Sequence, residues 1–448
     1  MTPQQIDLVQ LDNGLPNLDG RDDRRGLWRR GGGMIAHQRE RLLVIGAGMA
    51  AARLCDELAR RAPDRCDVTM VGAEPSAPYN RVLLSAALAG EIDDDELALD
   101  GAGWRSQANF RLLAGCPVAA LDLNRRIARR ADGRELAFDR VVFATGSSAV
   151  RLPIPGADLP GVATFRDHAD LAALRQAARG RGRVAVIGGG LLGIEAAAAL
   201  AKLGAAVTLV HRMDRLMERQ LDARSASFLK RAVERRGVEV RLEVETVAVA
   251  GETRADGLVF ADGGRLTADL VVIAVGVRPN VELARAAGLA VNRGIVVDQG
   301  LAASRSFVHA IGECAETAGQ VCGLVEPAYE QVSVLARRLA GERDARYVPA
   351  PPATHLKVAG APVFSAGEFD AADAEAITYE DRALGVSKRL TLRDNRLTGA
   401  VLVGETDDAL WYRDLIRDGA SVAAFRDDLI FGPAFCGRGE RRPVQEAA

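Results

Sequence analysis

Two glycine-rich turns hold the residues of this sequence that are best suited to chemistry. The first spans residues 46–51 (Gly-Ala-Gly-Met-Ala-Ala) and the second spans residues 188–193 (Gly-Gly-Gly-Leu-Leu-Gly). Each follows an apolar run and precedes an alanine-rich stretch, which gives the strand, turn and helix of a dinucleotide site. Small residues let the backbone approach a pyrophosphate at the helix N-terminus; they are Gly46, Gly48 and Ala51 in the first turn and Gly188, Gly190 and Gly193 in the second. Two such turns in one chain indicate two dinucleotides and electron transfer between them.

The residues that follow the next strand differ between the two turns. Glu74 follows the strand expected at residues 68–71, where an acid normally accepts hydrogen bonds from ribose hydroxyls; the alternative is a solvated loop acid. After residues 207–210 the sequence reads His211-Arg212, with no acid at that point. Arg212 could pair with a 2′-phosphate, which favours NADPH or tolerance of both nicotinamides. The alternative is that Arg212 only reaches solvent.

The sequence shows no catalytic triad, metalloprotease motif or paired acid and base. Glu195 lies just inside the second alanine-rich helix, where it could pair with a backbone donor or touch the nicotinamide side. The five histidines are isolated in the sequence and are expected to be structural. The demanding chemistry is therefore expected to belong to cofactors, which the protein positions and tunes.

Strands and helices alternate around both turns. The expected strands are 42–45, 68–71 and 141–144 in the first unit and 184–187, 207–210 and 270–275 in the second, with helices at about 49–61 and 192–203. This alternation predicts parallel sheets with helices on both faces. A strand and loop at 307–313 and a helix around 326–339 follow. Residues 363–364, 388–392 and 400–403 then form short strands before a helix at about 407–417.

Proline- and glycine-rich crossings, such as residues 152–161, indicate domain boundaries. The expected division is a disordered extension (1–37), the first part of one dinucleotide-binding domain (38–150), a second such domain (151–274), the remainder of the first (275–345), a C-terminal interface domain (346–435) and a tail (436–448). The fold class is therefore α/β, with two Rossmann-like dinucleotide-binding domains and a small α+β domain.

Composition is that of an ordinary globular protein. The 448 residues are 48% hydrophobic and 26% charged, with a formal net charge of −2, so nothing favours a nucleic-acid partner. No apolar run has the length of a membrane span, and the polar N-terminus does not resemble a secretory signal. The six cysteines are scattered, without a zinc spacing or a C-x-x-C pair. A reduced, cytoplasmic location is expected.

Together these features resemble the family of FAD-dependent pyridine nucleotide oxidoreductases, which have a glutathione-reductase-like fold. The resemblance implies that the first turn binds FAD and the second binds NAD(P)H. It rests on the first turn with Glu74, on Ala144-Thr145-Gly146, and on Ile311-Gly312-Glu313, whose acid would bind the ribitol chain. Glu313 stands where Asp is commoner. The resemblance also implies cofactor contacts for Arg81, Val118 (by the adenine), Gly276 and the helix start Glu326-Pro327 (by the flavin pyrimidine edge).

Longer strings are similar to the flavoprotein part of the large subunit of assimilatory NAD(P)H nitrite reductase. They are residues 72–75, 79–85, 159–167, 216–222 and 392–396, and the likeness runs from about residue 41 to residue 432. The C-terminal module resembles the interface domain of rubredoxin- and nitrite-reductase flavoproteins. It is expected to cover the open side of the flavin and to help select the acceptor.

Cysteine usage suggests where the electrons go. Residues 78–85 lack the redox cysteines of disulfide-reducing relatives, and Cys436 alone cannot hold an iron–sulfur cluster, which needs several ligands. We therefore expect a detached reductase component that passes a hydride from NAD(P)H to FAD and electrons to a separate protein of nitrate or nitrite reduction. The alternatives are an NAD(P)H:rubredoxin or ferredoxin reductase and a nicotinamide-sensing flavoprotein that acts by partner association. A homodimer is left open.

Overall fold

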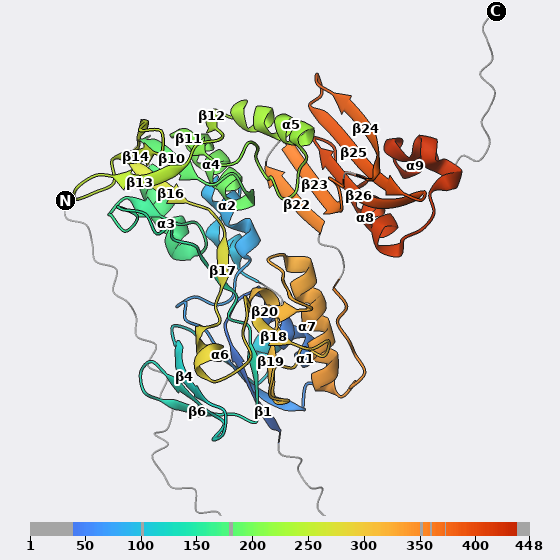
Figure 1. Cartoon of the computed structure of the whole chain (residues 1–448). Helices are drawn as coiled ribbons and strands as arrows, with labels where there is room; N and C mark the ends of the chain where they lie inside the picture. Colours follow the sequence, from blue (N-terminus) through green and yellow to red (C-terminus); the bar gives the residue numbers. More distant parts are fainter. Residues whose placement is uncertain are drawn as a thin grey trace, which may run out of the picture. The chain divides into compact units, whose positions relative to one another are not determined.

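Five parallel strands form the sheet that carries the first glycine turn in this computed structural model (Figure 1). Their spatial order is β19-β7-β1-β2-β3, so a strand from late in the chain completes a sheet that begins near residue 40. The strands are β1 (Glu40–Ile45), β2 (Cys66–Val71), β3 (Phe110–Leu113), β7 (Arg140–Phe143) and β19 (Val308–Ala310). The structure describes residues 39–99, 103–178, 182–349, 353–358, 361–371 and 373–436. The extension predicted at 1–37 and the tail beyond Cys436 lie outside the described residues.

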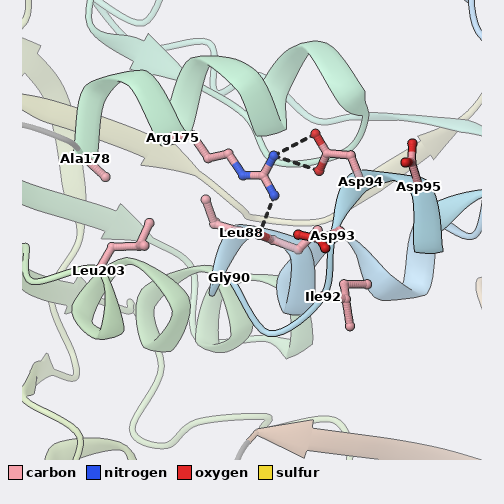
Figure 2. Close-up of a pocket in the computed structure, with 10 residues that line it drawn as sticks. Leu88, Gly90, Ile92, Asp93, Asp94, Asp95, Arg175, Ala178 and Leu203 are labelled. Carbon is pink, nitrogen blue, oxygen red and sulfur yellow. Dashed lines mark hydrogen bonds and ion pairs between the residues drawn. The ribbon is translucent and has the colours of Figure 1, made fainter.

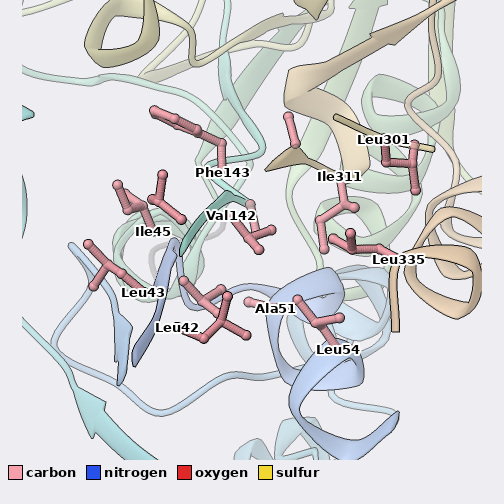
Figure 3. Close-up of a cluster of buried hydrophobic side chains, with 14 of the residues drawn as sticks. Leu42, Leu43, Ile45, Ala51, Leu54, Val142, Phe143, Leu301, Ile311 and Leu335 are labelled. Atoms are coloured by element: carbon pink, nitrogen blue, oxygen red, sulfur yellow. The ribbon is translucent and has the colours of Figure 1, made fainter. Parts of the chain in front are cut away.

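Apolar packing covers the central strand of this parallel sheet. Leu42, Leu43 and Val44 of β1 are at most 2% exposed, as expected for a central strand covered by other elements on both sides. Helices α1 (Met49–Arg61) and α7 (Val325–Ala340) contact each other, and their buried side chains join the same core cluster (Figure 3). The short alanines of α1 allow this close packing, so the helix that starts at the glycine turn is firmly held.

A second five-stranded parallel sheet carries the second glycine turn. Its order is β12-β11-β10-β16-β9. The strands are β9 (Val162–Ala163), β10 (Arg183–Ile187), β11 (Ala206–Val210), β12 (Val238–Arg241) and β16 (Leu270–Ile273), and the associated helices are α3 (His168–Ala178), α4 (Leu191–Lys202) and α5 (Ala223–Glu234). The predicted strand-turn-helix-strand order is confirmed around both turns, to within two residues at each end.

Short strands and turns connect and flank the two sheets. Strands β8 (Ser147–Ala149) and β17 (Val277–Pro279) pair antiparallel where the chain passes from the first sheet to the second and back. The three-stranded sheets are β4 (Val118–Asp122), β5 (Ile127–Arg130) and β6 (Glu135–Ala137); β13 (Thr246–Ala250), β14 (Gly257–Phe260) and β15 (Arg265–Thr267); and β18 (Ile295–Val297), β20 (Ala315–Thr317) and β21 (Gln320–Val321). Short helices are α2 (Leu84–Leu88), α6 (Glu282–Ala286), η1 (Arg81–Leu83), η2 (Asp94–Leu97), η3 (Gly103–Ser106) and η4 (Gly312–Cys314).

The C-terminal module is a five-stranded antiparallel sheet in the order β22-β23-β26-β25-β24. Its elements are β22 (Ala353–Val358), β23 (Ala361–Gly367), β24 (Glu375–Asp381), β25 (Val386–Arg393), β26 (Arg396–Val403), α8 (Ala409–Asp418), η5 (Ala423–Phe431) and α9 (Pro433–Cys436). Side chains of β26 alternate between two cores: Leu402 packs with Tyr412 of α8, whereas Val401 and Val403 belong to the cluster that contains α4 and α5. The sheet is therefore covered on both faces, and one face is anchored on the helices of the second dinucleotide unit. Among the described helices, none is long and apolar enough to cross a membrane.

Candidate functional site

The first glycine turn packs tightly on one side and is open on the other. Gly46 has φ +114°, and a Cβ there would lie 2.1 Å from the carbonyl oxygen of Ala144, at the end of β7. At Gly48 an added Cβ would meet nothing within 4 Å. Gly48 is also the N-cap of α1, and no side chain caps it. The first N–H groups of α1 therefore face open space, which fits a pyrophosphate.

The second turn repeats this geometry. Gly188 has φ +121°, and a Cβ there would lie 2.3 Å from the carbonyl oxygen of Ala274. Gly190 is open and is the uncapped N-cap of α4. At Gly193 a Cβ would lie only 1.9 Å from the carbonyl oxygen of Gly188, so the helix approaches the turn closely. Both turns thus fit a dinucleotide by the same physical criterion.

Both turns open on one cavity of about 1930 Å³. That volume exceeds the few hundred to about 1,000 Å³ of an ordinary small-molecule pocket. Most of the predicted cofactor residues line it: Gly46, Gly48, Glu74, Arg81, Val118, Ala144, Thr145, Gly146, Gly188, Gly190, Glu195, Arg212, Gly276, Gly312, Glu313 and Glu326. Ala51, Gly193 and Pro327 are not among the lining residues, and the contribution of Ala51 and Gly193 is close packing behind the turns.

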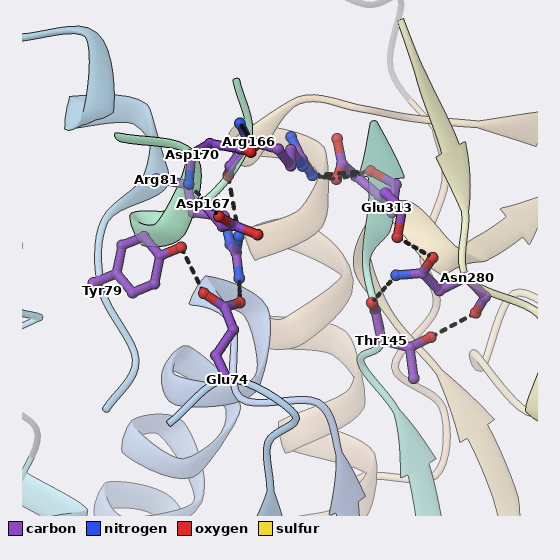
Figure 4. A network of polar contacts seen from close by, with 11 residues as sticks. Glu74, Tyr79, Arg81, Thr145, Arg166, Asp167, Asp170, Asn280 and Glu313 are labelled. Carbon is purple, nitrogen blue, oxygen red and sulfur yellow. Dashed lines mark hydrogen bonds and ion pairs between the residues drawn. The ribbon is translucent and has the colours of Figure 1, made fainter. Parts of the chain in front are cut away.

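Glu74, after β2, is held by two donors. The Tyr79 hydroxyl donates to one carboxylate oxygen at 2.8 Å, and Arg81 forms an ion pair with the other (Figure 4). Burial and the bond to Glu74 raise the pKa of Tyr79, although Arg81 opposes the shift. The Tyr79 ring in turn stacks on His168, with ring centroids 3.8 Å apart. Each oxygen of Glu74 retains acceptor capacity, so the carboxylate is oriented and can still accept a hydroxyl donor.

Glu313, the second predicted FAD acid, is held by a residue that sequence reasoning missed. Arg166 forms an ion pair with Glu313 and donates to the Ser147 hydroxyl at 2.9 Å. Ser147 donates to Glu313 at 2.7 Å. The Arg166 carbonyl accepts from Arg81 at 3.2 Å, so one polar network joins both predicted FAD acids through the segment that precedes α3 (Figure 4). The Nε of Arg166 is buried and has no hydrogen-bond partner among the described residues.

The Thr145-Gly146 segment is fixed by Asn280, just beyond β17. The Thr145 hydroxyl donates to the Asn280 carbonyl at 2.7 Å, and the Asn280 side-chain amide donates to the Thr145 carbonyl at 2.9 Å. Backbone bonds from Asn280 to Gly146 and from Val150 to Gly276 complete the connection. The predicted residues at 145, 146 and 276 are therefore brought together at the crossing between the sheets.

Glu195 lies on α4, and its side chain is largely buried in the cavity wall. Burial raises its pKa to about 7 from the ordinary 4.5, although a hydrogen bond from Ser85 of α2 partly opposes the shift. A substantial fraction of Glu195 is therefore protonated at neutral pH. The sequence left two roles open for Glu195. Within the described residues, no backbone N–H donates a hydrogen bond to its carboxyl group.

Two further predicted residues mark the rim of the cavity. Arg212 is exposed and makes no hydrogen bond or ion pair with any described residue. Glu326, at the start of α7, forms a 2.6 Å ion pair with Arg413 of α8. The C-terminal module thus reaches the start of α7 through a charged contact at the cavity. Glu218 also lines the cavity near Arg212, and sequence reasoning had not selected it.

A second cavity of about 620 Å³ shares no lining residue with the large one. Asp93, Asp94 and Asp95 lie on its wall (Figure 2). Arg175 of α3 forms a 2.7 Å ion pair with Asp94 and donates to the Ala87 carbonyl at 2.6 Å. These contacts join α3 to α2 and η2. In the described part of the chain, no group of His, Cys, Asp or Glu could hold a metal ion.

The class of protein follows from this geometry and from sequence comparison. Residues 40–334 match the family described as pyridine nucleotide-disulphide oxidoreductase, and residues 352–420 match the rubredoxin NAD+ reductase C-terminal domain. The chain belongs to the pyridine nucleotide-disulphide oxidoreductase family. Its two open glycine turns have the geometry that a dinucleotide pyrophosphate requires.

Two proteins of nitrite and nitrate reduction are similar to most of this chain. The nitrite reductase (NAD(P)H) of Bacillus subtilis (strain 168) is 40% identical over 88% of this chain and 49% of that protein. The assimilatory nitrate reductase electron transfer subunit of the same organism is 40% identical over 89% of this chain and 52% of that protein. The chain spans about half the length of both relatives. Among solved structures, a chain of the covalent putidaredoxin reductase-putidaredoxin complex matches with a TM-score of 0.78 at 27% identity, over 85% of this chain and 93% of that one.

Proposed function

We propose that this chain passes electrons from NAD(P)H through FAD to a redox protein outside the chain, as the reductase component of assimilatory nitrate or nitrite reduction. The observation that carries the proposal is the single cavity on which both glycine turns open. The likeness to two Bacillus subtilis proteins of nitrite and nitrate reduction supports the choice of pathway.

We assign the residues to the two cofactors as follows. Residues 38–150 and 275–345 would form the FAD-binding domain and residues 151–274 the NAD(P)H-binding domain. FAD would be held by Gly46, Gly48, Glu74, Arg81, Val118, Ala144, Thr145, Gly146, Gly312, Glu313 and Glu326, with Ala51 packed behind the first turn and Pro327 next to Glu326. The nicotinamide dinucleotide would be held by Gly188, Gly190, Glu195, Arg212 and Gly276, with Gly193 packed behind the second turn.

The protein's own contribution is to bind, orient and hold protons. The chemistry that FAD supplies when bound is hydride acceptance and electron release. Uncapped N–H groups at the starts of α1 and α4 would donate hydrogen bonds to the two pyrophosphates. Arg81 and Arg166 hold Glu74 and Glu313 in fixed positions, which lowers the entropic cost of binding. Glu195 can hold a proton in the cavity wall at neutral pH.

The C-terminal module, which we delimit at residues 346–435, would cover the flavin side and help to select the acceptor. Its ion pair between Arg413 and Glu326 at the cavity rim supports this role. The match of residues 352–420 to a rubredoxin reductase domain favours a second candidate function, an NAD(P)H:rubredoxin or ferredoxin reductase. We also propose a cytoplasmic location, which is supported by the six free thiols.

Stopped-flow spectroscopy tests the function. The flavin-loaded chain is reduced anaerobically with NADH or NADPH and then mixed with a nitrite reductase component, a rubredoxin or a ferredoxin. Fast flavin reduction, followed by reoxidation with only the nitrite reductase component, supports the proposal. Reoxidation by rubredoxin or ferredoxin alone favours the second candidate. A long-lived reduced flavin with every acceptor contradicts both and favours a nicotinamide sensor.

A further inference from the structure

The loop after β11 folds back onto the second glycine turn. The Met217 N–H donates to the Gly189 carbonyl at 2.9 Å. Met217 is fully buried and has φ +51°, a conformation that is rare for a residue with a Cβ. A Cβ at Gly189 would lie 2.7 Å from the His211 ring. The loop and the turn therefore form one closely packed unit.

His211 joins the turn to Glu218. Its Nδ1 accepts from the Gly189 N–H at 3.1 Å, and its Nε2 lies 3.1 Å from a carboxylate oxygen of Glu218. Because Nδ1 is the acceptor, the ring proton sits on Nε2 and points at the carboxylate. The side chains of His211 and Glu218 are 11% and 25% exposed. The carboxylate is thus fixed in place and keeps spare lone pairs.

This arrangement supplies a fixed carboxylate, which the sequence directly after β11 lacks. In dinucleotide sites an acid near the end of the second strand accepts a hydrogen bond from the ribose 2′-hydroxyl, and an arginine there accommodates a 2′-phosphate. Glu218 and Arg212 both line the cavity beside the second turn. Glu245 is a further carboxylate of this cavity, but it is exposed and no hydrogen bond or ion pair with a described residue fixes its side chain.

We propose that Glu218, positioned by His211, is the acceptor for the ribose 2′-hydroxyl and makes the second site selective for NADH. This inference rests on the proposed function, in which the second turn holds the nicotinamide dinucleotide. The carboxylate would accept a hydrogen bond from the 2′-hydroxyl of NADH, and its negative charge would repel the 2′-phosphate of NADPH. Arg212 and Arg219, which both line the cavity, remain as cations that would attract a 2′-phosphate once the charge of Glu218 is removed.

Calorimetry on the flavin-loaded chain tests the inference without turnover. The probes are ADP-ribose and 2′-phospho-ADP-ribose, and the variant is Glu218→Gln. We expect about tenfold weaker binding of ADP-ribose, from loss of a charged hydrogen bond, and tighter binding of the 2′-phosphate. Asp214→Asn is the matched control, because Asp214 is an exposed carboxylate of the same loop that does not line the cavity.

Positioning by His211 has its own variant. His211→Asn keeps an oxygen that can accept from Gly189 but cannot reach Glu218. It should shift selectivity in the same direction as Glu218→Gln, whereas a purely structural role would lower Tm and leave the ratio of the two probe affinities unchanged.

Several outcomes would overturn the inference. The measured quantity is the ratio of the affinities for ADP-ribose and 2′-phospho-ADP-ribose. The inference is wrong if this ratio is unchanged in Glu218→Gln, if it changes equally in Asp214→Asn, or if it changes in Glu245→Gln and not in Glu218→Gln. If the unaltered chain binds neither probe, the proposed function itself is wrong, and that result differs from all three.

Discussion

The two glycine turns share a backbone and differ in the side chains that surround it. Both first glycines have φ near +120° and stand against a strand-end carbonyl, and both helices begin uncapped beside open space. At the first turn, Glu74 follows its strand directly and is held by Arg81 and Tyr79. At the second, the carboxylate is Glu218, which a folded loop delivers and His211 holds.

The difference separates two requirements of dinucleotide binding. Close approach to a pyrophosphate constrains the backbone, so both turns have the same geometry. Recognition of the ribose needs only a carboxylate at the right place, and different segments can provide it. A further contrast lies seven residues after each first glycine: Arg53 on α1 is 45% exposed and pairs with Glu57, whereas Glu195 on α4 is largely buried.

The largest effect is expected from breaking one turn at a time. A Cβ at Gly46 or Gly188 collides with a carbonyl and demands a strained φ, so each alanine variant should lose about 3 kcal/mol or more of unfolding free energy. Gly46→Ala should be purified without flavin absorbance. Gly188→Ala should retain flavin that dithionite reduces and NADH does not.

Gly263→Ala is the matched control for the glycine variants. Gly263 has φ +85° but nothing lies within 4 Å of an added Cβ, so the cost should be only about 1 kcal/mol. If all three variants lose equal stability in denaturant titrations, strain and not collision dominates, and the close packing of the turns is not what matters.

The buried acid of α4 should make stability depend on pH. Its pKa of about 7 exceeds the ordinary 4.5, so the folded chain holds a proton that the unfolded chain has released between these values. Stability should therefore fall as the pH rises through that interval, by about 3 kcal/mol relative to Glu195→Gln. Urea unfolding at about pH 5 and about pH 8 measures this difference. Parallel pH profiles for the two proteins would show that Glu195 is not protonated in the fold.

Arg166→Ala should weaken the first site more than the second. It leaves the part-buried Glu313 with Ser147 as its remaining partner, and loss of a charge-assisted contact should weaken FAD binding by about tenfold. Flavin fluorescence on dilution measures the change. Arg129→Ala removes an exposed ion pair with Glu135 and should leave FAD affinity as it was. Equal losses in both variants would contradict a specific role for Arg166.

Local sequence pattern predicts the elements next to each turn because the apolar runs and small residues there act within a few positions. The helix expected at 49–61 is α1 with the same limits. Contacts between distant segments are not visible in this way. Arg166 lies 147 residues from Glu313, and Glu218 meets His211 in a loop where Met217 adopts a positive φ that the sequence does not announce. The antiparallel pairing of β8 with β17 likewise depends on the crossing between two sheets.

The smallest effect is expected from Arg212→Ala. Arg212 is exposed and has no partner among the described residues, so its removal should leave NADH binding and Tm unchanged. A 2′-phosphate would lose one solvent-screened cation, which should lower the NADPH-to-NADH ratio of flavin reduction rates by about three- to fivefold. Arg254→Ala, on an exposed loop outside the cavity, is the control. An unchanged ratio in Arg212→Ala would show that Arg212 reaches only solvent, and selectivity at the second turn would then depend on the other charged residues of the cavity, with Glu218 first among them.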